Sequence, residues 1–90
     1  KINLSLINNM DNSEILLSIN NIFVQVFKDP DIKINGNTTS DDVKNWDSLN
    51  NIILVVMIED FYKIRFDLDE VQKLKNVEDL CNCVAKYLNL

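Results

Sequence analysis

The feature that most constrains this chain is a long apolar run from Leu49 to Tyr62, which contains no glycine or proline. The run is too long for one strand, since strands usually have about five or six residues, and it turns acidic at Glu59 and Asp60. It therefore predicts a helix from Ser48 to about Lys63. Because its apolar residues leave almost no polar face, this helix must either be central or expose an apolar side to a partner.

Helical periodicity also marks segments on either side of this run. Apolar residues at three- and four-residue steps follow the polar triplet 11–13, and Asp29-Pro30 ends that helix because the residue before proline avoids helical geometry. A short helix is expected from about Asp67 to Lys73. The last helix should start at Asn76, which with Asp79 three residues later resembles a capping box.

Residues 29–46 form a long connection between the first two helices. Asn35-Gly36 is a turn signal, and residues 39–42 can form one helical turn. We expect Ile32 and Ile34 to pin this loop to the core. A loop this long in a small domain either spans a helix bundle or has a function of its own.

Together these segments predict an all-α fold, a small antiparallel helix bundle of three main helices plus a short one, with a long first loop. One glycine and one proline among 90 residues argue against an all-β fold built on tight turns. Residues 11–90 should form a single domain, and we expect residues 1–10 to be a loosely ordered tail.

Composition excludes several classes of function. A net charge of −5 makes nucleic acid a poor partner and favours partners with basic patches. The chain has no histidine, and its carboxylates are scattered, so neither a catalytic acid–base pair nor a zinc site is indicated. A calcium loop starting at Asp31 fails because Lys33 stands where an oxygen ligand is needed. We therefore expect no metal and no enzymatic activity in the chain itself.

Cys81 and Cys83 are two residues apart, so on a helix they point to different faces and cannot easily form a disulfide. Small apolar roles in a reducing compartment are expected, which favours the cytoplasm. No apolar run in the sequence approaches the roughly 20 residues of a membrane span.

The tripeptide Asp47-Ser48-Leu49 opens the apolar helix. A serine there can simply be a helix cap. From Ser48 onward, however, the pattern resembles the acyl carrier protein family without a gap as far as Leu80, and the likeness covers about residues 11–90. The matching positions are Leu49, Ile52, Leu54, Val55, Ile58, Glu59-Asp60, Tyr62, Ile64, Phe66 and Val77-Glu78-Asp79-Leu80, with the loop 37–42 also similar.

The resemblance implies that Ser48 carries a 4′-phosphopantetheine arm, with Asp47 and Leu49 contacting the enzyme that attaches it. It implies as partners a phosphopantetheinyl transferase with coenzyme A and the enzymes that load and use an acyl thioester. The pathway would be fatty-acid, polyketide or other specialised synthesis, and we expect a monomer. An unmodified carrier-like interaction module and a peptidyl or aminoacyl carrier are the alternatives.

Two features depart from the pattern of fatty-acid carriers. Where those proteins carry acidic residues early in the second helix, this chain has Asn50, Asn51 and Ile53. On a helical wheel Ile53, Val56 and Met57 lie together, and we expect them either to form an apolar partner-binding patch or to be buried. Trp46 before the tripeptide is typical of freestanding carriers of specialised pathways, and either covers the end of the bundle or contacts partners. Asp60 is a further expected partner contact.

Overall fold

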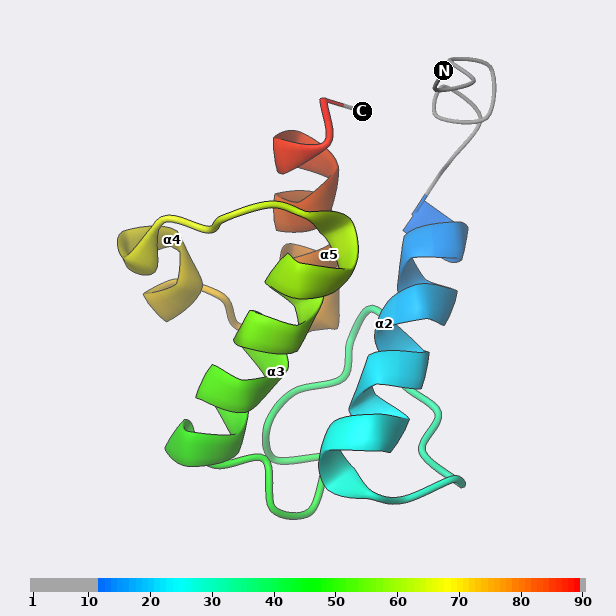
Figure 1. Ribbon diagram of the computed structural model, residues 1–90. Helices are drawn as coiled ribbons and strands as arrows, with labels where there is room; N and C mark the ends of the chain where they lie inside the picture. The colour runs from blue at the N-terminus through cyan, green and yellow to red at the C-terminus, as the bar shows by residue number, and fades with distance from the viewer. Residues whose placement is uncertain (1–11, 90) are drawn as a thin grey trace.

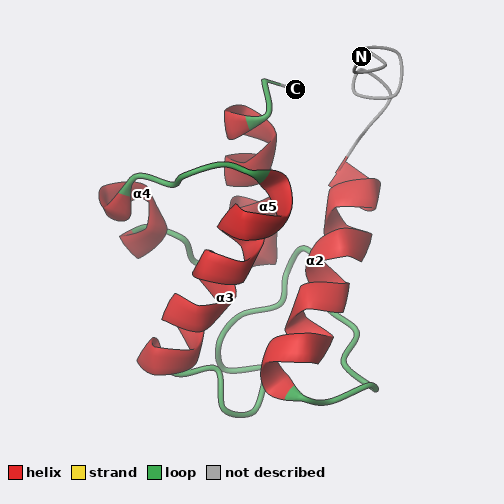
Figure 2. Ribbon diagram, in the orientation of Figure 1, coloured by secondary structure: helices red, strands yellow, loops and turns green. Residues whose placement is uncertain are grey.

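The computed structural model describes residues 12–89 of the chain, and the expected tail 1–10 lies outside this range. Within it the chain forms four helices and no strand (Figures 1 and 2). The helices are α2 (Asn12–Phe27), α3 (Ser48–Tyr62), α4 (Leu68–Gln72) and α5 (Val77–Tyr87). The prediction of three main helices plus a short one with a long first loop is confirmed, and none of these four helices is long and apolar enough to cross a membrane.

Helix α2 packs against both α3 and α5 and runs antiparallel to them, as Figure 1 shows. Its buried stripe supplies Phe23, the largest of the fully buried side chains that the structure describes. Opposite it lie Leu54 and Ile58 of α3 and the start of α5. The core residues that are at least nine-tenths buried are Ile15, Ile19, Ile22, Phe23, Ile34, Leu54, Ile58, Phe66, Val77, Leu80, Cys81, Cys83 and Val84.

The helix boundaries follow local capping chemistry. Helix α3 begins after Asp47, whose side chain accepts a hydrogen bond from the Asn50 N–H, and ends at Lys63, which adopts a left-handed conformation. Helix α5 begins after Asn76, whose side chain accepts from the Asp79 N–H at 2.8 Å. The Asp79 carboxylate in turn accepts a hydrogen bond from the Lys75 N–H. In a capping box this second bond comes from the cap residue itself, here Asn76, so the predicted motif forms with a donor one residue earlier.

The long loop between α2 and α3 is fixed to the helices by side chains and backbone. Ile34 is buried and Ile32 packs on the core, as expected from the sequence. Asn20 of α2 clamps this segment, since its side chain donates to the Ile32 carbonyl and accepts from the Ile34 N–H. Further on, residues 39–42 form a hydrogen-bonded turn and not a regular helix.

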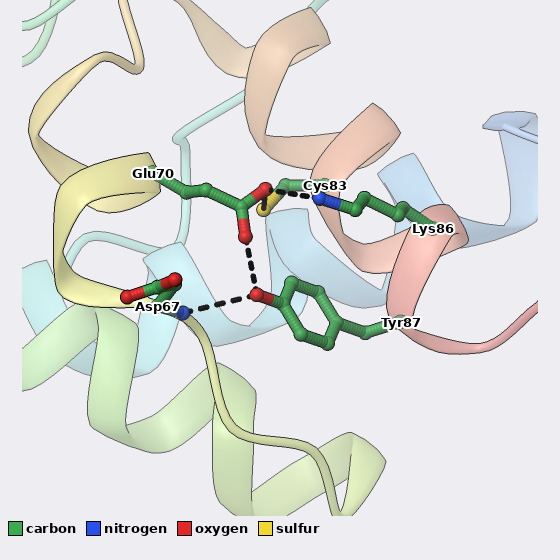
Figure 3. A network of polar contacts seen from close by, with 5 residues as sticks. All are labelled: Asp67, Glu70, Cys83, Lys86 and Tyr87. Atoms are coloured by element: carbon green, nitrogen blue, oxygen red, sulfur yellow. Dashed lines mark hydrogen bonds and ion pairs between the residues drawn. The ribbon is translucent and has the colours of Figure 1, made fainter.

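The short helix α4 is fastened to α5 by one polar cluster (Figure 3). Glu70 accepts hydrogen bonds from Lys86, at 2.8 Å, and from the Tyr87 hydroxyl. The same hydroxyl accepts from the Asp67 N–H at the start of α4. The hydrogen bond from Lys86, and then that from Tyr87, lower the pKa of Glu70 and raise the pKa values of both partners. Five residues are too few for a stable helix alone, so this cluster and the apolar contacts of α4 hold it.

Candidate functional site

Ser48 is the first residue of α3 and is exposed. Asp47 supplies two acceptors to the first turn: its side chain for the Asn50 N–H at 2.8 Å and its carbonyl for the Asn51 N–H at 2.8 Å. The N–H groups of Ser48 and Leu49 have no acceptor within the helix and point out from its end. The serine hydroxyl therefore lies where the helix dipole and these N–H groups favour a negative charge.

Trp46 ties this helix end to the rest of the bundle. Its indole N–H donates to the Asn51 side-chain oxygen at 2.9 Å. Its ring meets Phe23 edge-on at 5.0 Å between centroids and lies 6.4 Å from Phe27. The half-buried ring thus covers the end of the bundle, one of the two roles expected from the sequence.

Asn50 and Asn51, which replace the acidic residues usual in fatty-acid carriers, both make structural hydrogen bonds. Asn51 accepts from Trp46, and the Asn50 amide donates to the Asn45 carbonyl at 2.7 Å. Asn45 has a left-handed backbone with φ of 70°, a conformation that asparagine tolerates better than most residues. These bonds could not be predicted from the sequence, whose only signal is the three asparagines spaced around Trp46.

A cleft of about 370 Å³ opens beside Ser48, between α3 and the segment that joins α4 to α5. Its volume is within the range of small-molecule sites. Its polar lining includes Ser40, Asp47, Ser48 and Lys75. The apolar lining consists of Trp46, Leu54, Val55, Val71, Leu74 and Leu80. The sequence did not reveal this cleft, because it depends on how far α4 stands from α3.

The other residues expected to contact partners lie on α3. Ile53 and Val56 are 42% and 49% exposed, and Asp60 is exposed beyond them. Met57 is half-buried and turns toward α2, where it lines a groove with Ile22 and Phe61.

The exposed apolar surface of α3 also includes residues that the wheel did not assign to it. Leu49 is 67% exposed and Ile52 is 61% exposed. Leu49 is therefore not a core residue, and its side chain is accessible for the expected contact with an enzyme.

The thiols of the two cysteines are unsuited to act as nucleophiles. Both are buried and free, with no disulfide between them. Burial, and then the nearby Glu78, raise the pKa of Cys81 to about 11, and burial raises that of Cys83. At neutral pH both are therefore thiols and not reactive thiolates. Within residues 12–89 no three His, Cys, Asp or Glu residues gather in a way that could hold a metal ion.

A rigid helix bundle that presents an exposed serine at a capped helix end, beside an apolar cleft, is the framework of a carrier domain. Solved structures share the fold of this helix bundle. A holo acyl carrier protein from Geobacter metallireducens is 46% identical, with a TM-score of 0.78 over 82% of this chain and 85% of that one. A candidate acyl carrier protein from Mycobacterium tuberculosis is 26% identical, with a TM-score of 0.73 over 81% of this chain and 97% of the other.

These similarities show that the chain belongs to the acyl carrier protein family. The resemblance seen in the sequence from Ser48 to Leu80 is thereby confirmed. No protein-family model and no curated protein sequence matches the chain.

Proposed function

We propose that this protein carries an acyl group as a thioester on a 4′-phosphopantetheine arm attached to Ser48. It presents that group to the enzymes of a fatty-acid, polyketide or other specialised biosynthetic pathway. The observation that carries the proposal is the exposed hydroxyl of Ser48 at the first position of α3, on the rim of the cleft. Membership of the acyl carrier protein family supports it.

The residues around Ser48 fit a phosphodiester. The outward N–H groups at the start of α3 and the helix dipole would stabilise it by about 0.3–1 kcal/mol. Lys75 also lines this cleft and adds a positive charge to its lining. The apolar side chains that line the cleft, among them Leu54 and Leu80, give the arm or its cargo a surface away from water.

The division of labour follows from the side chains present. The arm supplies a terminal thiol that holds the acyl group. Ser48 has only to be accessible, because a separate transferase performs the modification, so we expect the chain to have no catalytic activity of its own. Tethering then raises the effective concentration of the acyl group at each partner's active site. We expect the protein to act as a monomer in the cytoplasm, a reducing compartment in which its two free cysteines would stay reduced.

The test is to incubate the purified protein with coenzyme A and a panel of phosphopantetheinyl transferases and to weigh it intact. We expect a mass gain of one phosphopantetheine, located by peptide mapping at Ser48. Ser48→Ala should gain nothing. Ser40→Ala is the matched control, because Ser40 is also exposed and lines the same cleft, and it should be modified normally. Modification of Ser48→Ala would contradict the assignment.

The second candidate is an interaction module that is never modified, which the exposed apolar residues of α3 favour. The two functions can be distinguished by the cellular activity of the Ser48→Ala variant in the natural host. An unmodified module would retain full cellular activity as Ser48→Ala, whereas a carrier would lose it.

A further inference from the structure

Two side-chain hydrogen bonds join the first turn of α3 to the loop that precedes it. The Asn50 amide donates to the Asn45 carbonyl at 2.7 Å. The Trp46 indole N–H donates to the Asn51 side-chain oxygen at 2.9 Å. We call this pair of hydrogen bonds the asparagine clasp. Each bond joins residues on opposite sides of Ser48, so the candidate attachment serine lies inside a closed loop of chain.

Backbone hydrogen bonds close the same loop. The Asp47 N–H donates to the Asn45 carbonyl at 2.9 Å, so that carbonyl accepts from both Asp47 and Asn50. The Asp47 carbonyl in turn accepts from the Asn51 N–H at 2.8 Å. Helix ends ordinarily fray, because their first N–H groups lack partners within the helix. Hydrogen bonds on both sides of Ser48 therefore restrict the motion of its backbone.

The asparagine clasp is anchored to the core through Trp46. The tryptophan ring meets Phe23 edge-on, and Phe23 is fully buried in α2. The position of Ser48 is therefore set by the bundle and not only by its own turn of helix. Asn50 and Asn51 are half-buried, whereas Ser48 is exposed. Their amides are thus used within the fold, next to a hydroxyl that is open to solvent.

We propose that Asn50 and Asn51 are positioning residues, which hold the Ser48 hydroxyl in the place and direction that transfer of the phosphopantetheine requires. This role rests on the proposed attachment at Ser48. In that transfer the serine oxygen bonds to the phosphorus of coenzyme A that carries the pantetheine, and the bond between the two phosphates breaks. Adenosine 3′,5′-bisphosphate leaves, and the serine proton passes to a base of the transferase.

Alignment of the serine oxygen sets the rate of this step. The attacking oxygen, the phosphorus and the leaving oxygen must lie roughly in line. A misplacement of about 1 Å can slow such a reaction about a hundredfold. Accessibility lets the transferase reach Ser48, whereas the asparagine clasp keeps the hydroxyl aligned once the enzyme is bound.

Exchanging amide for carboxylate at each asparagine tests the clasp, because the two residues use opposite ends of the amide. Asn50 donates and a carboxylate cannot, so Asn50→Asp should break its bond. Asn51 accepts and a carboxylate also accepts, so Asn51→Asp should keep the bond that Asn51→Ala breaks. The two aspartate variants add the same charge one residue apart, so a difference between them reports the hydrogen bond and not the charge.

The assay is single-turnover transfer by an excess of a transferase that modifies the wild-type protein, with KM measured separately at steady state. We expect the transfer rate to fall about tenfold for Asn50→Asp, Asn50→Ala and Asn51→Ala, with KM within about twofold of the wild type. Asn51→Asp should recover most of the rate that Asn51→Ala loses. Asn21→Asp is the control and should match the wild type, because Asn21 is exposed on α2.

A second measurement reads the order of Ser48 without a transferase. NMR relaxation of the backbone amides should give order parameters of about 0.85 at Ser48 and Leu49 in the wild type and below about 0.7 in Asn50→Ala. Thermal melts separate positioning from stability. An acidic residue in the first turn of a helix is stabilising, so Asn50→Asp should melt no lower than Asn50→Ala although both slow the transfer.

Three results would overturn the inference while leaving the carrier function intact. They are wild-type order parameters at Ser48 in Asn50→Ala, a transfer rate for Asn50→Asp that equals or exceeds that of Asn51→Asp, and a rise in KM with an unchanged transfer rate. The last result would make the asparagines direct contacts of the enzyme. If no transferase modifies the wild-type chain, the proposed function fails and this inference fails with it.

Discussion

Replacing Trp46 tests whether the tryptophan positions the start of α3 by packing on the bundle. Trp46→Ala removes the edge-on contact with Phe23, the contact with Phe27 and the hydrogen bond to Asn51. Fully buried tryptophans cost about 3–5 kcal/mol when cut to alanine, and Trp46 is half-buried, so we expect a loss of about 3 kcal/mol in the free energy of unfolding.

Trp46→Phe separates the two kinds of contact. Phenylalanine can keep the packing on Phe23 but has no N–H for Asn51, so the loss should be about 1 kcal/mol. Asn51→Ala should cost a similar amount. In the Trp46→Phe background Asn51→Ala should then cost little more, because both changes remove the same hydrogen bond.

The assay is urea unfolding followed by circular dichroism at neutral pH. In the wild type the fluorescence of Trp46, the single tryptophan, should give the same midpoint as circular dichroism. Leu17→Ala is the control and should change stability by no more than about 0.5 kcal/mol, because Leu17 is exposed. A loss below about 1 kcal/mol for Trp46→Ala would refute the packing role and leave partner contact as the remaining role for this residue.

Three other predictions concern a cap, a core thiol and the cluster on α4. Asp47→Ala removes the cap of α3 and should lower the free energy of unfolding, measured in urea, by about 0.5–2 kcal/mol. Asp47→Asn keeps an acceptor and should lower it by only about a few tenths of a kcal/mol. Equal losses for the two variants would show that the charge and not the cap matters. The pKa of Cys81 is raised to about 11 from its ordinary 9.0, so the thiol loses its proton more readily in the unfolded state than in the folded state. The stability that the protonated thiol contributes is therefore complete below pH 9 and is lost as the pH rises toward 11. Urea midpoints between these pH values should fall, less steeply for Cys81→Ala, and an equal slope in that variant would contradict the assignment. The pKa of Glu70 is lowered by Lys86 and then Tyr87, so its contribution is present above its unfolded pKa and is lost as the pH falls through the folded value. Glu70→Gln should flatten that acid dependence and speed amide exchange in α4, and unchanged exchange there would show that the cluster does not hold the helix.

The helices could be predicted from the sequence because their signals are local. Apolar spacing and caps such as Asn76 set the boundaries of α5 and α3 to within a residue or two. Asp47-Ser48-Leu49 at the head of an apolar helix, together with the resemblance that continues to Leu80, locates the candidate attachment site.

What the sequence could not predict depends on contacts between distant segments. The wheel grouped Ile53, Val56 and Met57 as either a surface patch or buried residues and did not include Leu49 and Ile52. A helix that is apolar nearly all round does not reveal which side meets its neighbours. The cleft beside Ser48 likewise depends on where α4 settles, which the Glu70 cluster determines across sixteen residues of chain.

The two acidic residues at the end of α3 illustrate the same limit. They look equivalent in the sequence, yet the Glu59 carboxylate accepts a hydrogen bond from the Phe66 backbone while Asp60 is exposed. Only the path of the chain after Lys63 distinguishes them. The assignment of Asp60 as a partner contact thus remains a prediction, and the structure leaves its side chain accessible for it.

The central claim is that Ser48 carries the arm, and the most direct test is the mass of the protein purified from its natural host. Intact mass and the mass of the peptide that contains Ser48 should show one phosphopantetheine on that serine, in part of the protein extended by an acyl group. Protein that is wholly unmodified at Ser48, in cells where Ser48→Ala keeps full activity, would contradict the account.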